Sequence, residues 1–209
     1  MVTASGSLRQ LPLRDRRRAQ TEREIGEAAL TLFEQRGVGA TTVDEIARLA
    51  GVSPRTFFRY FAVKELAALA PHRELENQFG EMLDGLRADR PVLPQLEAFW
   101  TDMLRRLDNG RSDAGRQLLR MRRLMCAEPS LRQAANRLDN PRADELVGQL
   151  AGIVGDEDHL GVRVLLSAAG APVDIALDTW ADATLSGLQV DLVAIYERCR
   201  SVLHDAVRA

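Results

Sequence analysis

A pair of short helices joined by a tight turn is the feature that most limits how this chain can fold. Thr42 and Glu45 have the spacing of a capping box, in which each side chain satisfies a backbone amide at the start of a helix. Gly51 supplies a residue that adopts positive φ without strain, as a tight turn requires. Ser53 then restarts a helix, because serine is a preferred N-cap and the following proline fits the first helical position. The pattern predicts helix, turn and helix within residues 42–60.

The rest of the chain also carries helical periodicity, and no convincing period-two strand appears in it. Ile25, Ala29, Leu32 and Phe33 form one apolar stripe of a first helix, which Gly37 ends. Six longer helices are predicted beyond residue 62, at about 63–87, 92–107, 114–126, 130–154, 157–183 and 190–207. The predicted fold class is therefore all-α, with an N-terminal three-helix helix-turn-helix domain followed by a six-helix bundle.

Three prolines fall inside predicted helices, and the sequence leaves open whether Pro71, Pro141 and Pro172 kink or split them. Residues 1–18 contain Gly, Pro and Ser without a sustained period and are predicted to form a flexible basic arm, a candidate for a minor-groove contact. The helix-turn-helix domain is then expected over 19–66 and the larger domain over 67–209.

Composition bounds the class of protein. With 209 residues, 45% hydrophobic and 28% charged, the chain is ordinary for a globular protein, which excludes disorder and fibrous repeats. We expect a cytoplasmic protein without a membrane span, because no charge-free run approaches the ~20 apolar residues of a spanning helix and no secretory leader is recognisable. Cys126 and Cys199 are too few for a disulfide framework.

Charge is divided unevenly along the chain. Residues 1–64 hold eleven basic and seven acidic side chains, a net charge of +4, whereas residues 65–209 have a net charge of −6. A basic end on an acidic body is typical of a protein that meets a polyphosphate with one end. An arginine-rich disordered tail is the alternative explanation.

Aromatic side chains concentrate on the second helix of the motif, where four of the chain's ten lie within five consecutive positions. Phe57 and Phe61 share one helical face, but Phe58 is rotated by ~100° from Phe57 and points elsewhere. An outward aromatic beside Arg55 and Arg59 suits a helix entering a DNA major groove, where arginine donates to guanine and apolar groups touch thymine methyls. Turn-linked helices also occur in purely structural bundles, so this interpretation has a rival.

Four segments in order, ALTLFEQRG, TTVDEIARLAGVS, RTFFRYF and KEL, resemble the DNA-binding domain of TetR-type transcriptional regulators over residues 21–66. RTFFRYF, with Glu-Pro-Ser-Leu131 further on, is similar to the mycofactocin-type branch of that family. The resemblance implies a homodimer, a ligand pocket in the larger domain and a cytoplasmic regulator that joins the nucleoid when bound to double-stranded operator DNA. It further implies a repressor released by a small apolar or amphipathic ligand.

The same resemblance implies DNA contacts for residues around the motif, namely Thr42, Ser53, Arg55, Thr56, Phe58, Arg59, Tyr60 and Lys64. Thr42 and Lys64, which is the only lysine of the chain, are expected to contact phosphate. Two positions depart from the family pattern: Phe58 stands where tyrosine is usual, and Ala62-Val63 replaces a polar cap before the lysine. Phe57 and Phe61 are expected in the core.

Side chains of the larger domain suggest a pocket and a dimer seam. Methionine and aromatic residues line adaptable pockets but also fill cores, and both interpretations stay open for Phe79, Met82, Leu83, Phe99, Trp100, Met103, Leu104, Met121 and Met125. Small and apolar residues of the last two predicted helices either form the dimer seam or complete the subunit core: Val164, Leu165, Ala168, Ala169, Leu177, Trp180 and Leu188. Arg120, Arg122 and Arg123 are interpreted as a solvated helix face, with contact to an anionic ligand as the alternative.

An enzyme is not expected. His72, His159 and His204 are far apart in sequence, and no metalloprotease, CxxC, nucleophile-elbow, phosphate-loop or dinucleotide pattern is present. No cofactor or metal is therefore predicted. The remaining alternative is a helical ligand-binding or interaction protein without a DNA role.

Overall fold

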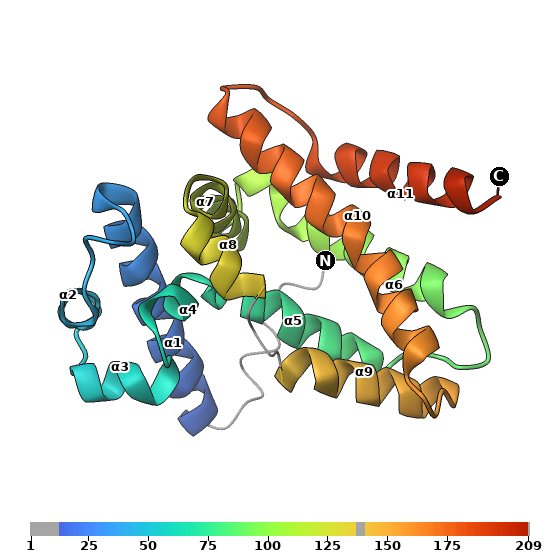
Figure 1. Ribbon diagram of the computed structural model, residues 1–209, viewed down its shortest axis with the longest axis horizontal. Helices are drawn as coiled ribbons and strands as arrows, with labels where there is room; N and C mark the ends of the chain where they lie inside the picture. The colour runs from blue at the N-terminus through green and yellow to red at the C-terminus, as the bar shows by residue number, and fades with distance from the viewer. Residues whose placement is uncertain (1–12, 137–140, 209) are drawn as a thin grey trace. The chain divides into compact units, whose positions relative to one another are not determined.

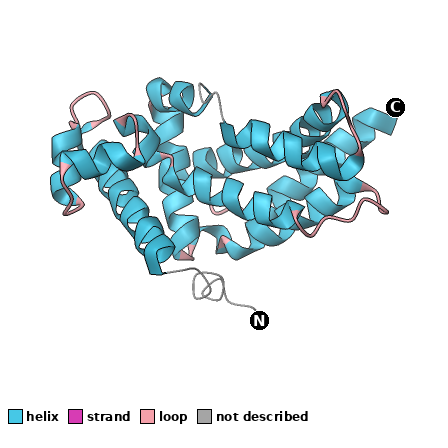
Figure 2. Ribbon diagram, turned by 90° about the horizontal axis from the view of Figure 1, so that it is seen from below, coloured by secondary structure: helices cyan, strands magenta, loops and turns pink. Residues whose placement is uncertain are grey.

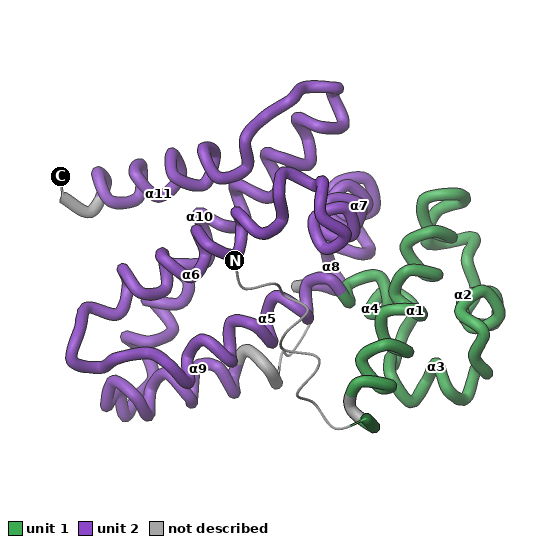
Figure 3. Tube along the Cα trace, turned by 180° about the vertical axis from the view of Figure 1, so that it is seen from behind, with its two compact units in different colours: residues 1–70 green, residues 71–209 purple. Residues whose placement is uncertain are grey.

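The computed structural model describes residues 13–136 and 141–208, and every regular element in those ranges is helical. The predicted all-α class is confirmed. The chain divides into two compact units, residues 1–70 and 71–209, which are drawn in green and purple in Figure 3.

From residue 13 onward the first unit contains four helices: α1 (Leu13–Arg36), α2 (Val43–Leu49), α3 (Pro54–Tyr60) and α4 (Lys64–Ala68). Helix α1 packs against α2 and α4, and α2 packs against α3 (Figure 1). The core is formed by fully or almost fully buried side chains, among them Ile25, Phe33, Ile46, Phe57 and Phe61. The helix-turn-helix pair is thus mounted on a core that α1 and α4 complete.

The predicted flexible arm is wrong from Leu13 onward, because α1 begins at that residue. The segment that follows is rich in arginine, glutamate, alanine and glutamine, which favour helix. Gln20 donates to the Glu24 carboxylate one turn later at 2.8 Å, as neighbours on a helix surface do. Residues 1–12, the remainder of the predicted arm, lie outside the described residues.

The second unit contains seven α-helices in its described part, α5 (Ala70–Leu83), α6 (Val92–Arg106), α7 (Asp113–Ala127), α8 (Pro129–Asn136), α9 (Pro141–Val154), α10 (Leu160–Leu185) and α11 (Leu192–Arg208). A short 3-10 helix, η2 (Asp108–Gly110), precedes α7. Helix α10 packs against α6, α7, α9 and α11 and is therefore the central element of this unit. Short loops join the helices in Figure 2.

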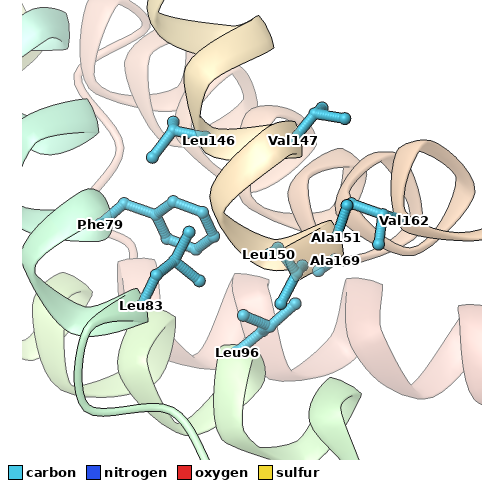
Figure 4. Packing of buried hydrophobic residues seen from close by; sticks show 9 residues of the cluster. All are labelled: Phe79, Leu83, Leu96, Leu146, Val147, Leu150, Ala151, Val162 and Ala169. Atoms are coloured by element: carbon cyan, nitrogen blue, oxygen red, sulfur yellow. The ribbon is translucent and has the colours of Figure 1, made fainter. Parts of the chain in front are cut away.

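One hydrophobic cluster of this unit gathers side chains from α5, α6, α9 and α10, as Figure 4 shows: Phe79, Leu83, Leu96, Leu146, Val147, Leu150, Ala151, Val162 and Ala169. Phe79 stacks on Trp100 with ring centroids 5.1 Å apart and planes inclined by 13°. Phe99 meets the same Phe79 ring edge-on at 5.6 Å. The aromatic side chains of α5 and α6 thus hold these two helices together.

Two predicted helices are divided near prolines, so the described residues beyond residue 62 form eight α-helices where six were predicted. The helix expected over 63–87 ends at Ala68 with Leu69 as its C-cap, and α5 starts beside Pro71. The helix expected over 130–154 is two helices, the second of which begins at Pro141. Both outcomes follow from proline's preference for the first turn of a helix, where its missing N–H costs nothing.

Pro172, in contrast, lies inside an unbroken α10. Helix α10 is long and apolar enough to cross a membrane by length and composition, a test that core helices of soluble proteins also pass. Its Leu177 and Trp180 are buried, and its Asp174 pairs with a buried arginine of α7. Helix α10 therefore acts as a core helix in this unit, and packing on its inner face compensates for the hydrogen bond lost at Pro172.

Candidate functional site

The start of α2 is fixed by the predicted capping box. The Thr42 side chain accepts from the amide of Glu45, and the Glu45 carboxylate accepts from the amide of Thr42 at 2.9 Å and from its hydroxyl at 2.8 Å. These hydrogen bonds, helped by Arg36 at 2.9 Å, hold the pKa of Glu45 below its usual range. Thr42 is thereby held at the exposed beginning of α2.

The turn between α2 and α3 also follows the sequence prediction. Gly51 has φ +68°, and the amide of Val52 donates to the Ala47 carbonyl at 2.9 Å. Ser53 caps α3 by accepting from the Thr56 amide at 3.0 Å. The Ser53 and Thr56 hydroxyls lie 2.9 Å apart in a further hydrogen bond, which orients both side chains at the start of α3.

Helix α3 buries one face and exposes the other. Phe57 and Phe61 lie in the core, as predicted, whereas 57% of Phe58 is exposed. The Phe58 ring is held edge-on against Phe57 with centroids 5.5 Å apart. Arg55 and Arg59 are exposed beside it. The guanidinium groups of Arg55 and Arg59 therefore stand next to an outward aromatic surface. In a major groove, arginine donates to guanine and an apolar surface contacts the methyl group of thymine.

Arg59 and Tyr60 form a second ordered pair on this helix. The Arg59 guanidinium lies over the Tyr60 ring, 5.2 Å from its centroid. Such a cation–π contact restricts the arginine to one side of the helix. Tyr60 thus orients a neighbouring charge while its own side chain remains half-exposed.

Lys64 differs from the expectation. Its ammonium group donates to the carbonyls of Val38 and Thr41 at 2.6 and 2.7 Å, so two of its three N–H groups are used inside the unit. The Thr41 hydroxyl in turn donates to the Gly37 carbonyl at 2.9 Å. Lys64 therefore ties the turn between α1 and α2 to the start of α4, and a free phosphate clamp is not what the geometry shows.

The second unit holds a cavity of about 580 Å³ whose lining combines apolar side chains with several charged ones. The lining consists of His72, Leu75, Glu76, Phe79, Trp100, Arg122, Leu146, Val147, Arg163, Leu166, Ser167, Gly170, Ala171, Val173, Asp174 and Leu177. Helices α5, α6, α7, α9 and α10 contribute to it. Phe79 and Trp100 are the predicted pocket residues found there.

The other seven predicted pocket residues do not line this cavity, and a ligand-binding role for them stays a prediction: Met82, Leu83, Phe99, Met103, Leu104, Met121 and Met125. Leu83, Met103, Leu104 and Met121 are almost completely buried between helices. Large apolar side chains at helical spacing fill contacts between helices as readily as they line a pocket, and periodicity does not separate the two.

Arg122 is the polar residue that the sequence interpretation placed wrongly. It is only 4% exposed, and it pairs with Asp174 at 2.9 Å and Asp178 at 3.2 Å instead of facing solvent. Its position between Leu118 and Met125 on the apolar stripe of α7 was a usable signal. An arginine on such a stripe must be buried with partners, because an unpaired buried charge is costly.

His72 lies beside Arg122 in the lining of the cavity. Burial lowers its pKa, and the Glu76 carboxylate at 3.6 Å opposes that shift without reversing it. The positive charge of Arg122 lowers the pKa further. His72 is therefore neutral at neutral pH.

The predicted dimer seam mixes two faces of α10 and adds Leu188, which follows that helix. Ala169, Leu177 and Trp180 are buried within the unit, so they are not available to a partner and that part of the prediction is wrong. Val164 and Leu188 are 62% and 58% exposed. Leu165 and Ala168 are half-buried.

A capped helix-turn-helix with arginines and an outward phenylalanine on its second helix, joined to a separate helical unit, is typical of a DNA-binding regulator. The family model for "Bacterial regulatory proteins, tetR family" matches residues 25–66. Residues 25–66 therefore match the DNA-binding domain of TetR-type transcriptional regulators, and the chain resembles such a regulator over most of its length. It is not an enzyme, because the proteins that it resembles are regulators.

Two curated relatives are regulators. The chain is 29% identical over 202 residues to the HTH-type transcriptional regulator TcmR of Streptomyces glaucescens, a match that covers 91% of this chain and 88% of TcmR. It is 47% identical over 49 residues to a protein named as the mycofactocin biosynthesis transcriptional regulator MftR of Mycobacterium tuberculosis, covering 23% of this chain and 25% of MftR. That short match leaves the mycofactocin-type branch a prediction.

Solved structures support the fold. NalD of Pseudomonas aeruginosa aligns with a TM-score of 0.54 at 19% identity, covering 89% of this chain and 96% of NalD. FadR of Bacillus subtilis, solved with stearoyl-CoA, aligns with a TM-score of 0.52 at 22% identity, covering 86% and 96%. Regulators of this family are soluble cytoplasmic proteins that bind operator DNA and small-molecule effectors and typically act as dimers.

Proposed function

We propose that this protein is a homodimeric repressor that reads operator DNA with α3 and leaves it when a small molecule fills the cavity of the second unit. The observation that carries the proposal is the exposed face of α3, where Arg55, Phe58 and Arg59 stand clear of a core formed by Phe57 and Phe61. Thr42, Ser53, Thr56 and Tyr60 complete the proposed DNA-contacting set. The protein then works in the cytoplasm, on the nucleoid while it is bound.

A dimer follows from the small reach of one recognition helix. A single helix reads only a few base pairs, so specificity needs two copies about 34–36 Å apart. Leu160, Val164, Ile175 and Leu185 are all more than half exposed and fall within about 80° of each other around α10. We propose this outer face of α10, in place of its buried face, as the apolar part of the dimer interface.

Release by a ligand requires that the ligand favour one conformation. A cavity of about 580 Å³ is within the usual range of about 300–1,000 Å³ for small-molecule sites. A ligand that fills it preferentially in the form that does not bind DNA shifts the equilibrium by a coupling of about 1–3 kcal/mol. The apolar lining around Phe79 and Leu146 favours an apolar or amphipathic ligand.

The test begins with selection of a bound sequence from a random duplex library, followed by gel shifts on the selected duplex and on a scrambled one. Arg55→Ala should weaken binding to the selected duplex by about 1–3 kcal/mol and change binding to the scrambled duplex little. If the wild-type chain enriches no sequence from the library, the result would favour the alternative, a helical ligand-binding or interaction protein without a DNA role.

A further inference from the structure

We infer that the cavity of the second unit takes an uncharged molecule with an apolar body and a hydrogen-bond-accepting oxygen, and that it disfavours carboxylates. This inference rests on the effector-binding part of the proposed function and names the chemical class of the effector. It is carried by two unpartnered N–H groups, by the pairing of both cavity arginines and by the aromatic wall.

The first observation is a missing acceptor. The indole N–H of Trp100 and the Nε–H of Arg122 are buried and have no hydrogen-bond partner within the described chain. Both residues line the cavity. The Nε–H of Arg123 is unpartnered too, but Arg123 does not line the cavity. Buried polar groups almost always find partners, so two unpartnered donors on residues that line one cavity favour an occupant with acceptor atoms. A molecule offering only donors gains nothing from these groups.

The second observation concerns charge. Arg122 already faces two carboxylates, Asp174 and Asp178, and the other arginine of the lining, Arg163, pairs with Asp144 at 3.1 Å. An incoming carboxylate would therefore approach guanidinium groups whose charge is compensated, and Glu76 lies on the same lining. A neutral carbonyl or ether oxygen accepts a hydrogen bond without this repulsion.

The third observation concerns the body of the ligand. Phe79 and Trp100 are stacked with their rings 5.1 Å apart, and Leu146, Val147 and Leu166 continue the apolar wall. Apolar surface of this kind gains from burying rings or hydrocarbon chains. Because Trp100 belongs to this wall and also carries one of the unpartnered N–H groups, a carbonyl attached directly to an apolar ring system suits both features.

The test uses three probes of nearly equal shape, 2-acetylnaphthalene, 2-naphthoate and 2-ethylnaphthalene, titrated into the full-length protein without DNA by isothermal titration calorimetry at pH 7.5. The ketone should bind about three- to tenfold more tightly than the hydrocarbon, the gain expected from one net hydrogen bond. The carboxylate should bind more weakly than the ketone.

Trp100→Phe is the matched variant, because phenylalanine keeps a six-membered aromatic ring and lacks only the five-membered ring that carries the indole N–H. In this variant the advantage of the ketone over the hydrocarbon should fall to less than twofold. The inference is overturned if 2-naphthoate binds best, if the three probes bind alike, if the ketone does not bind up to millimolar concentration, or if its advantage survives in Trp100→Phe. Because no DNA is present, these outcomes are separate from those of the operator selection and gel shifts.

Discussion

Replacing Lys64 by methionine should destabilise the first unit and leave the salt dependence of DNA binding unchanged. The ammonium group makes two hydrogen bonds to the carbonyls of Val38 and Thr41, at 2.6 and 2.7 Å. A hydrogen bond from a charged donor contributes about 1.5–3 kcal/mol, and partial exposure of Lys64 reduces the sum of two. Methionine keeps the apolar stem, so we expect a loss of about 2–4 kcal/mol in the free energy of unfolding.

Salt dependence separates this internal role from a phosphate contact. Each phosphate contact contributes about 0.9 to the slope of log K against log salt concentration. If Lys64 is committed to two carbonyls, Lys64→Met should leave that slope within about 0.3 of the wild-type value per subunit. The assays are urea unfolding followed by circular dichroism, and fluorescence anisotropy with the selected duplex from 50 to 200 mM salt at a temperature where the variant is folded.

Arg59→Gln is the matched control. It also removes one positive charge from the first unit, but that charge is exposed, and no hydrogen bond like those from Lys64 to the carbonyls of Val38 and Thr41 is lost. This variant should keep its stability and lower the slope by about one per subunit. The reasoning about Lys64 would be refuted by the opposite result, in which Lys64→Met lowers the slope by about one and unfolds at the wild-type urea concentration.

Three further predictions concern the second unit. Gly115→Ala should cost about 1–3 kcal/mol of unfolding free energy in urea titrations, because its new Cβ would collide with the backbone carbonyl of Leu107. Gly148→Ala, whose Cβ would enter open space, should stabilise by about 0.5–1 kcal/mol, and equal effects of the two substitutions would contradict the packing. Burial lowers the pKa of His72 in the folded chain, so the unfolded chain binds more protons once the pH drops below the ordinary histidine pKa of 6.5. The free energy of unfolding should therefore decrease as the pH is lowered, by at most about 1.4 kcal/mol per pH unit, and His72→Gln should remove this decrease. Burial and the Glu97 charge raise the pKa of Tyr196 to about 12, so absorbance at 295 nm should show a tyrosine titrating there that is absent in Tyr196→Phe, and stability should begin to fall above pH 10, where the unfolded chain ionises first.

The helix-turn-helix could be predicted because its determinants are local. The capping box of Thr42 and Glu45, the turn at Gly51 and the N-cap at Ser53 each act within four residues, and all three take the expected geometry. The burial of Phe57 beside an exposed neighbour also followed from helical angles alone. Short-range hydrogen bonds and side-chain direction suffice at these positions.

Long-range partners could not be predicted in the same way. Lys64 binds carbonyls 26 and 23 residues earlier in the chain, and nothing in its immediate sequence distinguishes that role from a solvent-facing charge. The apolar residues of α10 show the same limit, since the stripe chosen as a seam mixed the buried Trp180 with the exposed Val164. Periodicity identifies an apolar face. Where one helix has two apolar faces, only the packing partners show which face is buried inside the subunit.

Arg122 shows how far a buried charge can extend such reasoning. An arginine on an apolar stripe demands carboxylates from another helix, and two carboxylates four residues apart on one face satisfy that demand. Asp174 and Asp178 have this spacing in α10, whose other side is apolar, and they are the partners observed at 2.9 and 3.2 Å. The Nε–H of Arg122 has no partner, and both Arg122 and Asp174 line the cavity, so the ion pair that joins α7 to α10 also contributes charged groups to the cavity lining. A carboxylate effector would have to compete with Asp174 for Arg122, whereas a neutral oxygen would complete the guanidinium without breaking that contact.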